Sequence, residues 1–213
     1  MSDYLLKLDN VTKTFGRRLI FKDLNYTFTS GKVYGIAGPN GSGKSTLVKI
    51  MSGLISSTSG KVIHMLGEKT ITPEQLHNYM GFLSPYLFLY DEFSAEENLQ
   101  YFAHIRGVRY DDEKVKQLLE EFNLYDRRND LLKEYSSGMK QRIKLLFALI
   151  HKPYLLILDE PTSNLDNEGK DKFYQIIKDE ARLNLAIIAS NEESDLALCD
   201  EIIYLKNYKA EKN

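Results

Sequence analysis

The sequence has a single cysteine, little excess of either charge and no long hydrophobic run. Each of these features argues against a class of structure or of partner. Because Cys199 is the only cysteine among 213 residues, an internal disulfide is excluded, and we expect a reducing compartment and a small buried apolar role for Cys199. The 28 Lys and Arg residues nearly balance the 30 Asp and Glu residues. The net charge of -2 gives no reason to expect a nucleic-acid partner, and we read Arg17-Arg18 as part of a solvated surface.

A membrane-spanning segment is not expected either. The longest apolar stretches, residues 145–150 and 154–158, are separated by His151-Lys152-Pro153 and fall far short of the about 20 residues that a spanning helix needs. Residues 4–9 alternate between apolar and polar side chains like a strand, without the apolar core of a signal peptide. We therefore expect a cytoplasmic protein that reaches a membrane only through a partner.

The most informative motif is a phosphate-binding loop at residues 38–46, with the sequence GPNGSGKST. It follows an apolar strand and precedes a helix that opens at Ser45, which is the context that a P-loop requires. Its glycines let the backbone wrap around phosphate, Lys44 supplies a charge for the β- and γ-phosphates, and the Ser45 hydroxyl is placed to ligate Mg²⁺. We predict that a Mg²⁺-bound nucleoside triphosphate contacts the whole loop, namely Gly38, Pro39, Asn40, Gly41, Ser42, Gly43, Lys44, Ser45 and Thr46.

The order of strand and helix signals predicts an α/β fold. Residues 4–37 read as an antiparallel β region that leads into the P-loop strand, and residues 61–65 read as a further strand. Two continuous apolar runs, residues 154–158 and 185–189, suit parallel strands that helices cover on both faces. In such sheets ligands gather at the carboxyl ends of the strands, which is where we expect Gly38, Asp159 and Ser190 to lie.

Helix signals fill the middle of the chain. Capping boxes predict helices that start near Thr72 and near Ser94, and apolar residues at helical spacing up to Phe122 indicate a helical insert. We predict a single domain over residues 1–213: a P-loop core with a mostly parallel sheet, an N-terminal antiparallel β region, and a helical subdomain inserted at approximately residues 85–150.

A second motif places two carboxylates where the apolar run of residues 155–158 ends. Adjacent strand residues point to opposite faces, so we predict different roles for Asp159 and Glu160. Asp159 would hold Mg²⁺, directly or through water, and Glu160 would orient or deprotonate the attacking water. The alternative is an acidic pair that caps a helix just before Pro161.

These motifs together resemble those of ATP-binding cassette (ABC) ATPases, the motor subunits of ABC transporters, over about residues 4–205. The loop at 38–46 resembles Walker A, and LLILDEP at 155–161 resembles Walker B. YSSGMKQR at 135–142, which opens a helix with a cluster of small residues, resembles the signature usually written LSGGQ, and residues 163–166 follow as the D-loop would. Phe15 stands in the place of the adenine-stacking aromatic, with a core phenylalanine as the alternative.

The resemblance implies the ABC ATPase fold, ATP and Mg²⁺ as cofactors, and two cassettes packed head to tail. Ser136 and the Gly138 N–H would then contact the γ-phosphate of a nucleotide held by a second ABC ATPase subunit, in a homodimer or a heterodimer. Transmembrane transporter subunits would dock on the helical insert and hold the chain at the cytoplasmic face of the membrane.

Two family positions differ in this sequence. The loop that normally carries a glutamine reads Ser84-Pro85-Tyr86, where Ser84 could supply a hydroxyl or only form a turn. Asn191 stands where the family has a histidine; it can donate a hydrogen bond to the γ-phosphate but cannot shuttle a proton. Alternatively, Ser190 and Glu193 form a capping box and Asn191 lies in the first turn of a helix.

The leading hypothesis is an ATP-binding and ATP-hydrolysing subunit of an ABC transporter, which dimerises on ATP and drives transmembrane partners. Because both auxiliary groups differ, we expect ATP hydrolysis to be slow or to depend on a partner and on Glu160. The alternatives are a soluble ABC ATPase that acts on ribosomes or DNA, and a regulatory module that dimerises on ATP with little hydrolysis.

Overall fold

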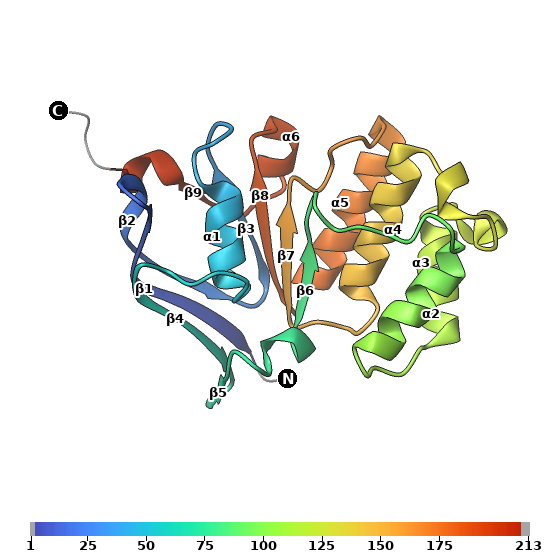
Figure 1. The fold of residues 1–213 in the computed structure, drawn as a ribbon, viewed down its shortest axis with the longest axis horizontal. Helices are drawn as coiled ribbons and strands as arrows, with labels where there is room; N and C mark the ends of the chain where they lie inside the picture. Colours follow the sequence, from blue (N-terminus) through green and yellow to red (C-terminus); the bar gives the residue numbers. More distant parts are fainter. Residues whose placement is uncertain (1–2, 210–213) are drawn as a thin grey trace.

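The computed structural model describes residues 3–209, which form two β-sheets flanked by helices (Figure 1). The first sheet is antiparallel, with the strand order β2-β1-β4-β5, and comprises β1 (Tyr4–Phe15), β2 (Arg18–Thr29), β4 (Ser59–Leu66) and β5 (Lys69–Ile71). The second sheet is parallel, with the order β6-β7-β8-β3-β9, and comprises β3 (Lys32–Ala37), β6 (Met80–Leu83), β7 (Leu155–Asp159), β8 (Leu185–Ser190) and β9 (Glu201–Tyr204). The predicted α/β class, with one antiparallel and one parallel region, is confirmed.

Helices cover both faces of the parallel sheet. The α-helices are α1 (Lys44–Met51), α2 (Ala95–Ile105), α3 (Asp112–Glu121), α4 (Ser137–Leu149), α5 (Asn167–Ala181) and α6 (Glu193–Leu196). Short 3-10 helices are η1 (Leu76–Asn78), η2 (Tyr125–Arg127), η3 (Leu132–Glu134) and η4 (Leu205–Tyr208). Figure 1 shows α2, α3 and α4 grouped at the end of the molecule opposite the antiparallel sheet. They lie between β6 and β7 in the chain, where the helical insert is expected; its boundaries stay a prediction.

The strand β7 shows why its apolar run is continuous. Leu155 and Ile157 belong to a core that includes α1 and the antiparallel sheet. Leu156 and Leu158 belong to a second core, which includes α4 and α5. Successive strand residues point to opposite faces, so a parallel strand covered on both faces needs apolar side chains at every position. The prediction that this run is a doubly covered parallel strand is confirmed.

One of the two predicted helix starts is confirmed and the other is wrong. At Ser94 the capping box is complete, because the Ser94 hydroxyl accepts from the Glu97 N–H and the Glu97 carboxylate accepts from the Ser94 N–H. After Thr72 the chain forms only a turn and the 3-10 helix η1. The next strand, β6, already begins at Met80, which leaves too few residues for an α-helical hydrogen-bond ladder to become favourable.

Two observations bear on the expectations from composition. Within residues 3–209, no helix has both the length and the apolar character needed to cross a bilayer. Cys199 is half-buried rather than fully buried, and it packs against the core that contains α5. Burial raises the pKa of the Cys199 thiol to about 12, with the nearby Asp195 and Asp200 carboxylates adding to the effect.

His64 provides a test of the core between the antiparallel sheet and α1. It is 6% exposed, its Nδ1 lies 2.8 Å from the Tyr4 hydroxyl, and burial lowers the pKa of His64 to about 4. The unfolded chain binds this proton near pH 6.5, so the free energy of unfolding should fall as the pH drops from 6.5 to 4. We predict that His64→Gln reduces this pH dependence by up to one proton, about 1.4 kcal/mol per pH unit.

Urea denaturation at pH 7, 6 and 5 measures the effect. His104→Gln, at an exposed position on α2, is the matched control and should follow the parent. Parallel stability profiles for His64→Gln and the parent would contradict the prediction.

Candidate functional site

The site is built at the carboxyl end of β3, where the chain turns sharply into α1. Gly41 and Gly43 adopt φ angles of 73° and 110°, a left-handed region that glycine enters without steric cost. A Cβ on Gly38 would lie 2.6 Å from the Ser42 Oγ, and one on Gly43 would lie 2.5 Å from a methyl group of Ile20. The loop therefore closes around a cradle that a side chain on either glycine would disrupt, as phosphate binding by backbone N–H groups requires.

Lys44 is the first residue of α1, and its side chain is only 5% exposed. Its Nζ donates to the Gly38 carbonyl oxygen at 2.9 Å and pairs with Glu160 Oε1 at 3.0 Å. The lysine thus folds back over the loop, and its charge is balanced by the carboxylate that follows β7. A buried ammonium needs such a partner, because an unpaired charge is poorly tolerated away from water.

Ser45 and Asp159 form a second contact between α1 and β7. The Ser45 Oγ donates to Asp159 Oδ1 at 3.0 Å, whereas Asp159 Oδ2 is buried and accepts no hydrogen bond from residues 3–209. Burial raises the pKa of the Asp159 carboxyl group above its usual value, and the Ser45 hydrogen bond opposes this effect. A hydroxyl and a carboxylate oxygen that lacks a partner are hard oxygen donors, which suit Mg²⁺. Residues 3–209 contain no cluster of three or more His, Cys, Asp or Glu that could hold a metal ion. The remaining Mg²⁺ ligands would therefore be phosphate oxygens and water.

Glu160 lies one residue beyond β7, and its φ angle of 47° places it in the left-handed region. The prediction that Asp159 and Glu160 point to opposite faces is therefore wrong, because strand alternation ends at Asp159. Both carboxylates contact the start of α1, at Ser45 and Lys44 respectively. The alternative in which they cap a helix is also wrong, since the next helix, α5, is capped by Asp166.

A pocket of about 460 Å³ brings most of the predicted cofactor residues together. Of these residues it is lined by Phe15, Asn40, Gly41, Ser42, Gly43, Lys44, Ser45 and Thr46, and by the predicted catalytic residue Glu160. Sequence reasoning missed four further lining residues, Arg18, Ile20, Pro85 and Tyr86. Gly38 and Pro39 do not line the pocket, although the Gly38 carbonyl oxygen contacts Lys44.

Phe15 and Arg18 stand together at one end of this pocket. Phe15 is 52% exposed, which rules out the core alternative, and the Lys13 ammonium lies 4.7 Å from its ring centroid. A two-residue turn at Gly16-Arg17 pairs Phe15 directly with Arg18 across the hairpin of β1 and β2. Gly16 indicates a tight turn, and a tight turn would place Arg18 opposite Phe15. This glycine could have shown that Arg18, although exposed, also lines the pocket.

The predicted signature residues lie at the start of α4 and do not line this pocket. Ser136 is exposed and caps α4, since its Oγ accepts from the Met139 N–H at 3.2 Å. A Cβ on Gly138 would lie 2.8 Å from the Asn164 carbonyl oxygen. One turn later, the Gln141 side chain donates to the Pro161 carbonyl oxygen at 2.7 Å. The start of α4 is thus packed against the loop that follows Glu160.

The two positions that differ from the family pattern are also resolved by geometry. The Ser84 Oγ is buried and accepts from the Tyr86 N–H at 3.3 Å, as a turn requires, and this turn places Tyr86 at the pocket. Asn191 is exposed and does not line the pocket. The capping box between Ser190 and Glu193 does not form, since Glu192 is the N-cap of α6.

Ser190 is the neighbour of Asn191 that does reach the site. It is fully buried, and its Oγ lies 3.4 Å from Glu160 Oε2. The prediction that Ser190 lies at the same edge of the sheet as Asp159 is confirmed. The contact of its hydroxyl with Glu160 was not predicted, because it depends on the alignment of β7 with β8.

Comparisons with known proteins agree with this geometry. A family model described as ABC transporter matches residues 21–163 of the chain. The chain is similar to the linearmycin resistance ATP-binding protein LnrL of Bacillus subtilis (strain 168), with 32% identity over 206 residues that cover 93% of this chain and 65% of LnrL. It is 38% identical to YhcH, an uncharacterized ABC transporter ATP-binding protein of the same organism, over 212 residues that cover 96% of this chain and 68% of YhcH.

A solved structure is similar over nearly the whole chain. It is described as a putative ABC transporter ATP-binding protein from Pyrococcus furiosus, and it aligns with a TM-score of 0.83 at 25% identity. The alignment covers 97% of this chain and 100% of that chain. The chain spans 65% and 68% of the lengths of LnrL and YhcH, respectively.

Asp159→Asn tests the electrostatics of the site. Because burial raises the pKa of this carboxyl group, its ionised form destabilises the folded protein at neutral pH. This destabilisation decreases as the pH falls through the folded-state pKa and is lost below the unfolded-state pKa. We predict that Asp159→Asn raises the Tm of the nucleotide-free protein at pH 7.5, because the neutral amide does not carry the charge that burial disfavours. The variant should also lose the Mg²⁺-dependent part of nucleotide affinity.

Calorimetry with and without Mg²⁺ measures both effects. Asp126→Asn, at an exposed position in η2, is the control and should leave Tm and affinity unchanged. A lower Tm for Asp159→Asn would show that the buried carboxylate stabilises the fold.

Proposed function

This chain belongs to the ABC transporter family, and we propose that it is an ATP-binding and ATP-hydrolysing subunit that dimerises on ATP and drives transmembrane partner subunits. The proposal rests on one observation: four side chains meet at one edge of the parallel sheet. Lys44 lies 3.0 Å from Glu160, and Ser45 lies 3.0 Å from Asp159. The same pocket contains the glycine-rich cradle and the exposed ring of Phe15.

Each residue of the site has a separate role in ATP hydrolysis. The adenine stacks on Phe15, the loop N–H groups hold the phosphates, and Lys44 exchanges its contacts with Gly38 and Glu160 for phosphate oxygens. Ser45 and Asp159 would hold Mg²⁺, which would supply positive charge against the phosphate oxygens. Glu160, released from Lys44, accepts a hydrogen bond from the attacking water and orients it or takes its proton.

A second cassette completes the site. Ser136 and the Gly138 N–H lie at the start of α4, outside the pocket of their own chain, with Ser136 exposed. A helix N-terminus attracts anions, so these groups are suited to contact the γ-phosphate of ATP held by another subunit. ATP then links two cassettes, and hydrolysis releases them. Both a homodimer and a heterodimer satisfy this arrangement.

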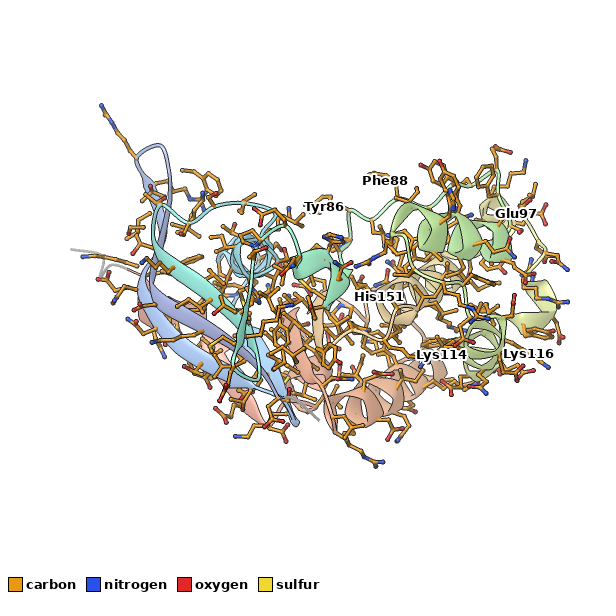
Figure 2. The ribbon with its side chains drawn as sticks, turned by 90° about the horizontal axis from the view of Figure 1, so that it is seen from below. Tyr86, Phe88, Glu97, Lys114, Lys116 and His151 are labelled. Atoms are coloured by element: carbon orange, nitrogen blue, oxygen red, sulfur yellow. The ribbon has the colours of Figure 1, made fainter. Side chains whose placement is uncertain are left out.

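Exposed apolar side chains near α2 support docking of a transmembrane partner. Phe88, in the loop before α2, is 89% exposed, and Figure 2 shows it near Tyr86 at the outer edge of the molecule. Further exposed apolar side chains in the same part of the chain are Tyr90, Phe93, Tyr101 and Ile105. Such a group of exposed apolar residues is typical of an interaction surface. We propose that it receives an apolar segment of a transmembrane subunit, which holds the chain at the cytoplasmic face of the membrane.

A slowly hydrolysing regulatory module is the second candidate. It is favoured by the absence of a glutamine in Ser84-Pro85-Tyr86 and by the exposed position of Asn191 outside the pocket. Asn191 would have to move toward the pocket to serve the γ-phosphate as predicted. In this case ATP still joins two subunits, but turnover is negligible without a partner.

Two variants separate binding from hydrolysis. We predict that Lys44→Ala weakens ATP binding about 10–100-fold, because a hydrogen bond to a charged group contributes about 1.5–3 kcal/mol. Glu160→Gln should bind ATP like the parent but hydrolyse it at least about 100-fold more slowly, since it cannot accept a proton. Calorimetric titration with ATP and single-turnover hydrolysis measure the two effects.

Lys61→Ala, at an exposed position on β4, is the control and should resemble the parent in both assays. Unchanged affinity in Lys44→Ala would refute the P-loop assignment. Equal hydrolysis by Glu160→Gln and the parent would remove Glu160 from catalysis, and measurable binding with negligible turnover in the parent would favour the regulatory module.

The docking surface has its own test. We predict that Phe88→Ser reduces co-purification of an integral membrane protein from detergent-solubilised host membranes by at least about 10-fold, because an apolar anchor of this size contributes about 2 kcal/mol. ATP affinity of the isolated variant should not change, since Phe88 does not line the nucleotide pocket. Leu183→Ser is the control, because Leu183 is 60% exposed in the turn before β8. Equal recovery with both variants would place the partner elsewhere.

A further inference from the structure

Asp195 is a fully buried carboxylate in α6 that is bound by hydroxyl groups rather than by a cation. Its Oδ1 accepts from the Thr162 and Tyr174 hydroxyls, both at 2.8 Å, and its Oδ2 accepts from the Ser190 hydroxyl at 2.6 Å. Buried carboxylates are retained only where hydrogen bonds compensate for the loss of water. Asp195 does not line the nucleotide pocket, so its role is not direct contact with ATP.

Two of the three hydroxyl donors belong to segments that hold Glu160. Thr162 stands two residues after Glu160, in the loop that leads to α5. Ser190 ends β8 immediately after Ala189, whose carbonyl oxygen accepts from the Glu160 N–H at 2.8 Å. Asp195 therefore joins the loop after β7 to the end of β8, and Glu160 lies between these two points.

The hydroxyl of Ser190 has one hydrogen and two carboxylates near it. Asp195 Oδ2 is 2.6 Å away, whereas Glu160 Oε2 is 3.4 Å away, so the hydrogen belongs to the contact with Asp195. The Glu160 oxygen then has no strong donor on this side. It remains available to accept a hydrogen bond from water, which is the role proposed for Glu160.

The backbone of Glu160 needs such support. Its left-handed φ of 47° is unfavourable for a residue with a Cβ and persists only when its surroundings fix it. Three contacts fix the loop after Glu160: the Ser163 hydroxyl donates to the Glu160 carbonyl oxygen, Gln141 donates to that of Pro161, and Thr162 donates to Asp195. Asp195 is the member of this group that also holds Ser190.

We propose that Asp195 is a positioning residue for ATP hydrolysis, which holds the Glu160 carboxylate toward the attacking water through Thr162 and Ser190. This proposal rests on the proposed function of Glu160. A shift of about 1 Å in a reacting group can lower the rate about 100-fold, so loss of this support should affect the chemical step rather than ATP binding.

Asp195→Ala and Asp195→Asn test the proposal by steady-state kinetics and calorimetry. Asp195→Ala should lower kcat at least about 10-fold and leave the KM and the affinity for ATP within about 2-fold of the parent. Asp195→Asn keeps an oxygen acceptor of the same shape and should recover part of kcat. Asp171→Ala, at an exposed position on α5, is the control. Parent-like kcat in Asp195→Ala, or an equal loss of kcat and ATP affinity, would overturn the proposal.

A double variant distinguishes positioning from a general loss of structure. In Asp195→Ala combined with Glu160→Gln, hydrolysis should be no slower than in Glu160→Gln alone, because the two residues act in series. Hydrogen exchange offers a readout without turnover: Asp195→Ala should speed exchange in residues 160–165 and leave the interiors of β7 and β8 protected. Multiplicative losses of rate, or unprotected strands, would indicate a structural role and overturn the proposal.

Smaller substitutions keep the test valid if Asp195→Ala does not fold. Ser190→Ala and Thr162→Val each remove one hydroxyl donor to Asp195, and each should lower kcat without weakening ATP binding. Parent-like kcat in both would refute the proposal. Failure of the proposed function is a different result, because Glu160→Gln would then hydrolyse ATP like the parent whatever stands at position 195.

Discussion

The parallel alignment of β3, β8 and β7 is the constraint on which the site depends. In this register Ala37 lies beside Ser190, and Ala189 lies beside Asp159. The carboxyl ends of the three strands are therefore level, and the segments that leave them start at the same edge of the sheet. The phosphate-binding loop, the acidic pair and Ser190 are adjacent in space for this reason, although Ser45 and Asp159 are 114 residues apart in the chain and Glu160 and Ser190 are 30 residues apart.

Two of the charges brought to this edge, those of Lys44 and Glu160, compensate each other. Lys44 is paired with Glu160, and Ser45 donates to one oxygen of Asp159 while the other oxygen has no partner. Buried charges need partners, so this arrangement allows a preformed site to exist in the absence of phosphate and metal. Binding then becomes an exchange of partners. In the proposed mechanism, phosphate takes the place of Glu160 at Lys44, and Glu160 is then free to accept a hydrogen bond from the attacking water.

The sequence was sufficient for the parts of this site that depend on local spacing. The P-loop and the serine cap of α4 are set by neighbouring residues, so their backbone geometry could be predicted, whereas the left-handed backbone of Glu160 was not predicted. Arg18 and Tyr86 were not predicted to line the pocket, because a hairpin turn and a loop bring them there. Ser190 was expected at this edge of the sheet, but its contact with Glu160 was not, because that contact depends on strand pairing. The helix expected after Thr72 failed for a tertiary reason, since the chain has to enter β6 almost at once. Strands covered on both faces, such as β7, could be predicted from their continuous apolar runs. Four-residue elements such as α6 and β9 could not, because they are too short to show a helical or strand periodicity.

Cys199 gives the chain a convenient chemical property. Its half-buried thiol has a pKa of about 12, so the thiolate that reacts with alkylating reagents is scarce at neutral pH. No other cysteine exists among the 213 residues. A cysteine introduced at an exposed position, for example by Lys116→Cys on α3, would therefore carry a fluorophore or spin label selectively in the otherwise natural sequence. Two labelled copies could then report whether the proposed dimer forms and separates.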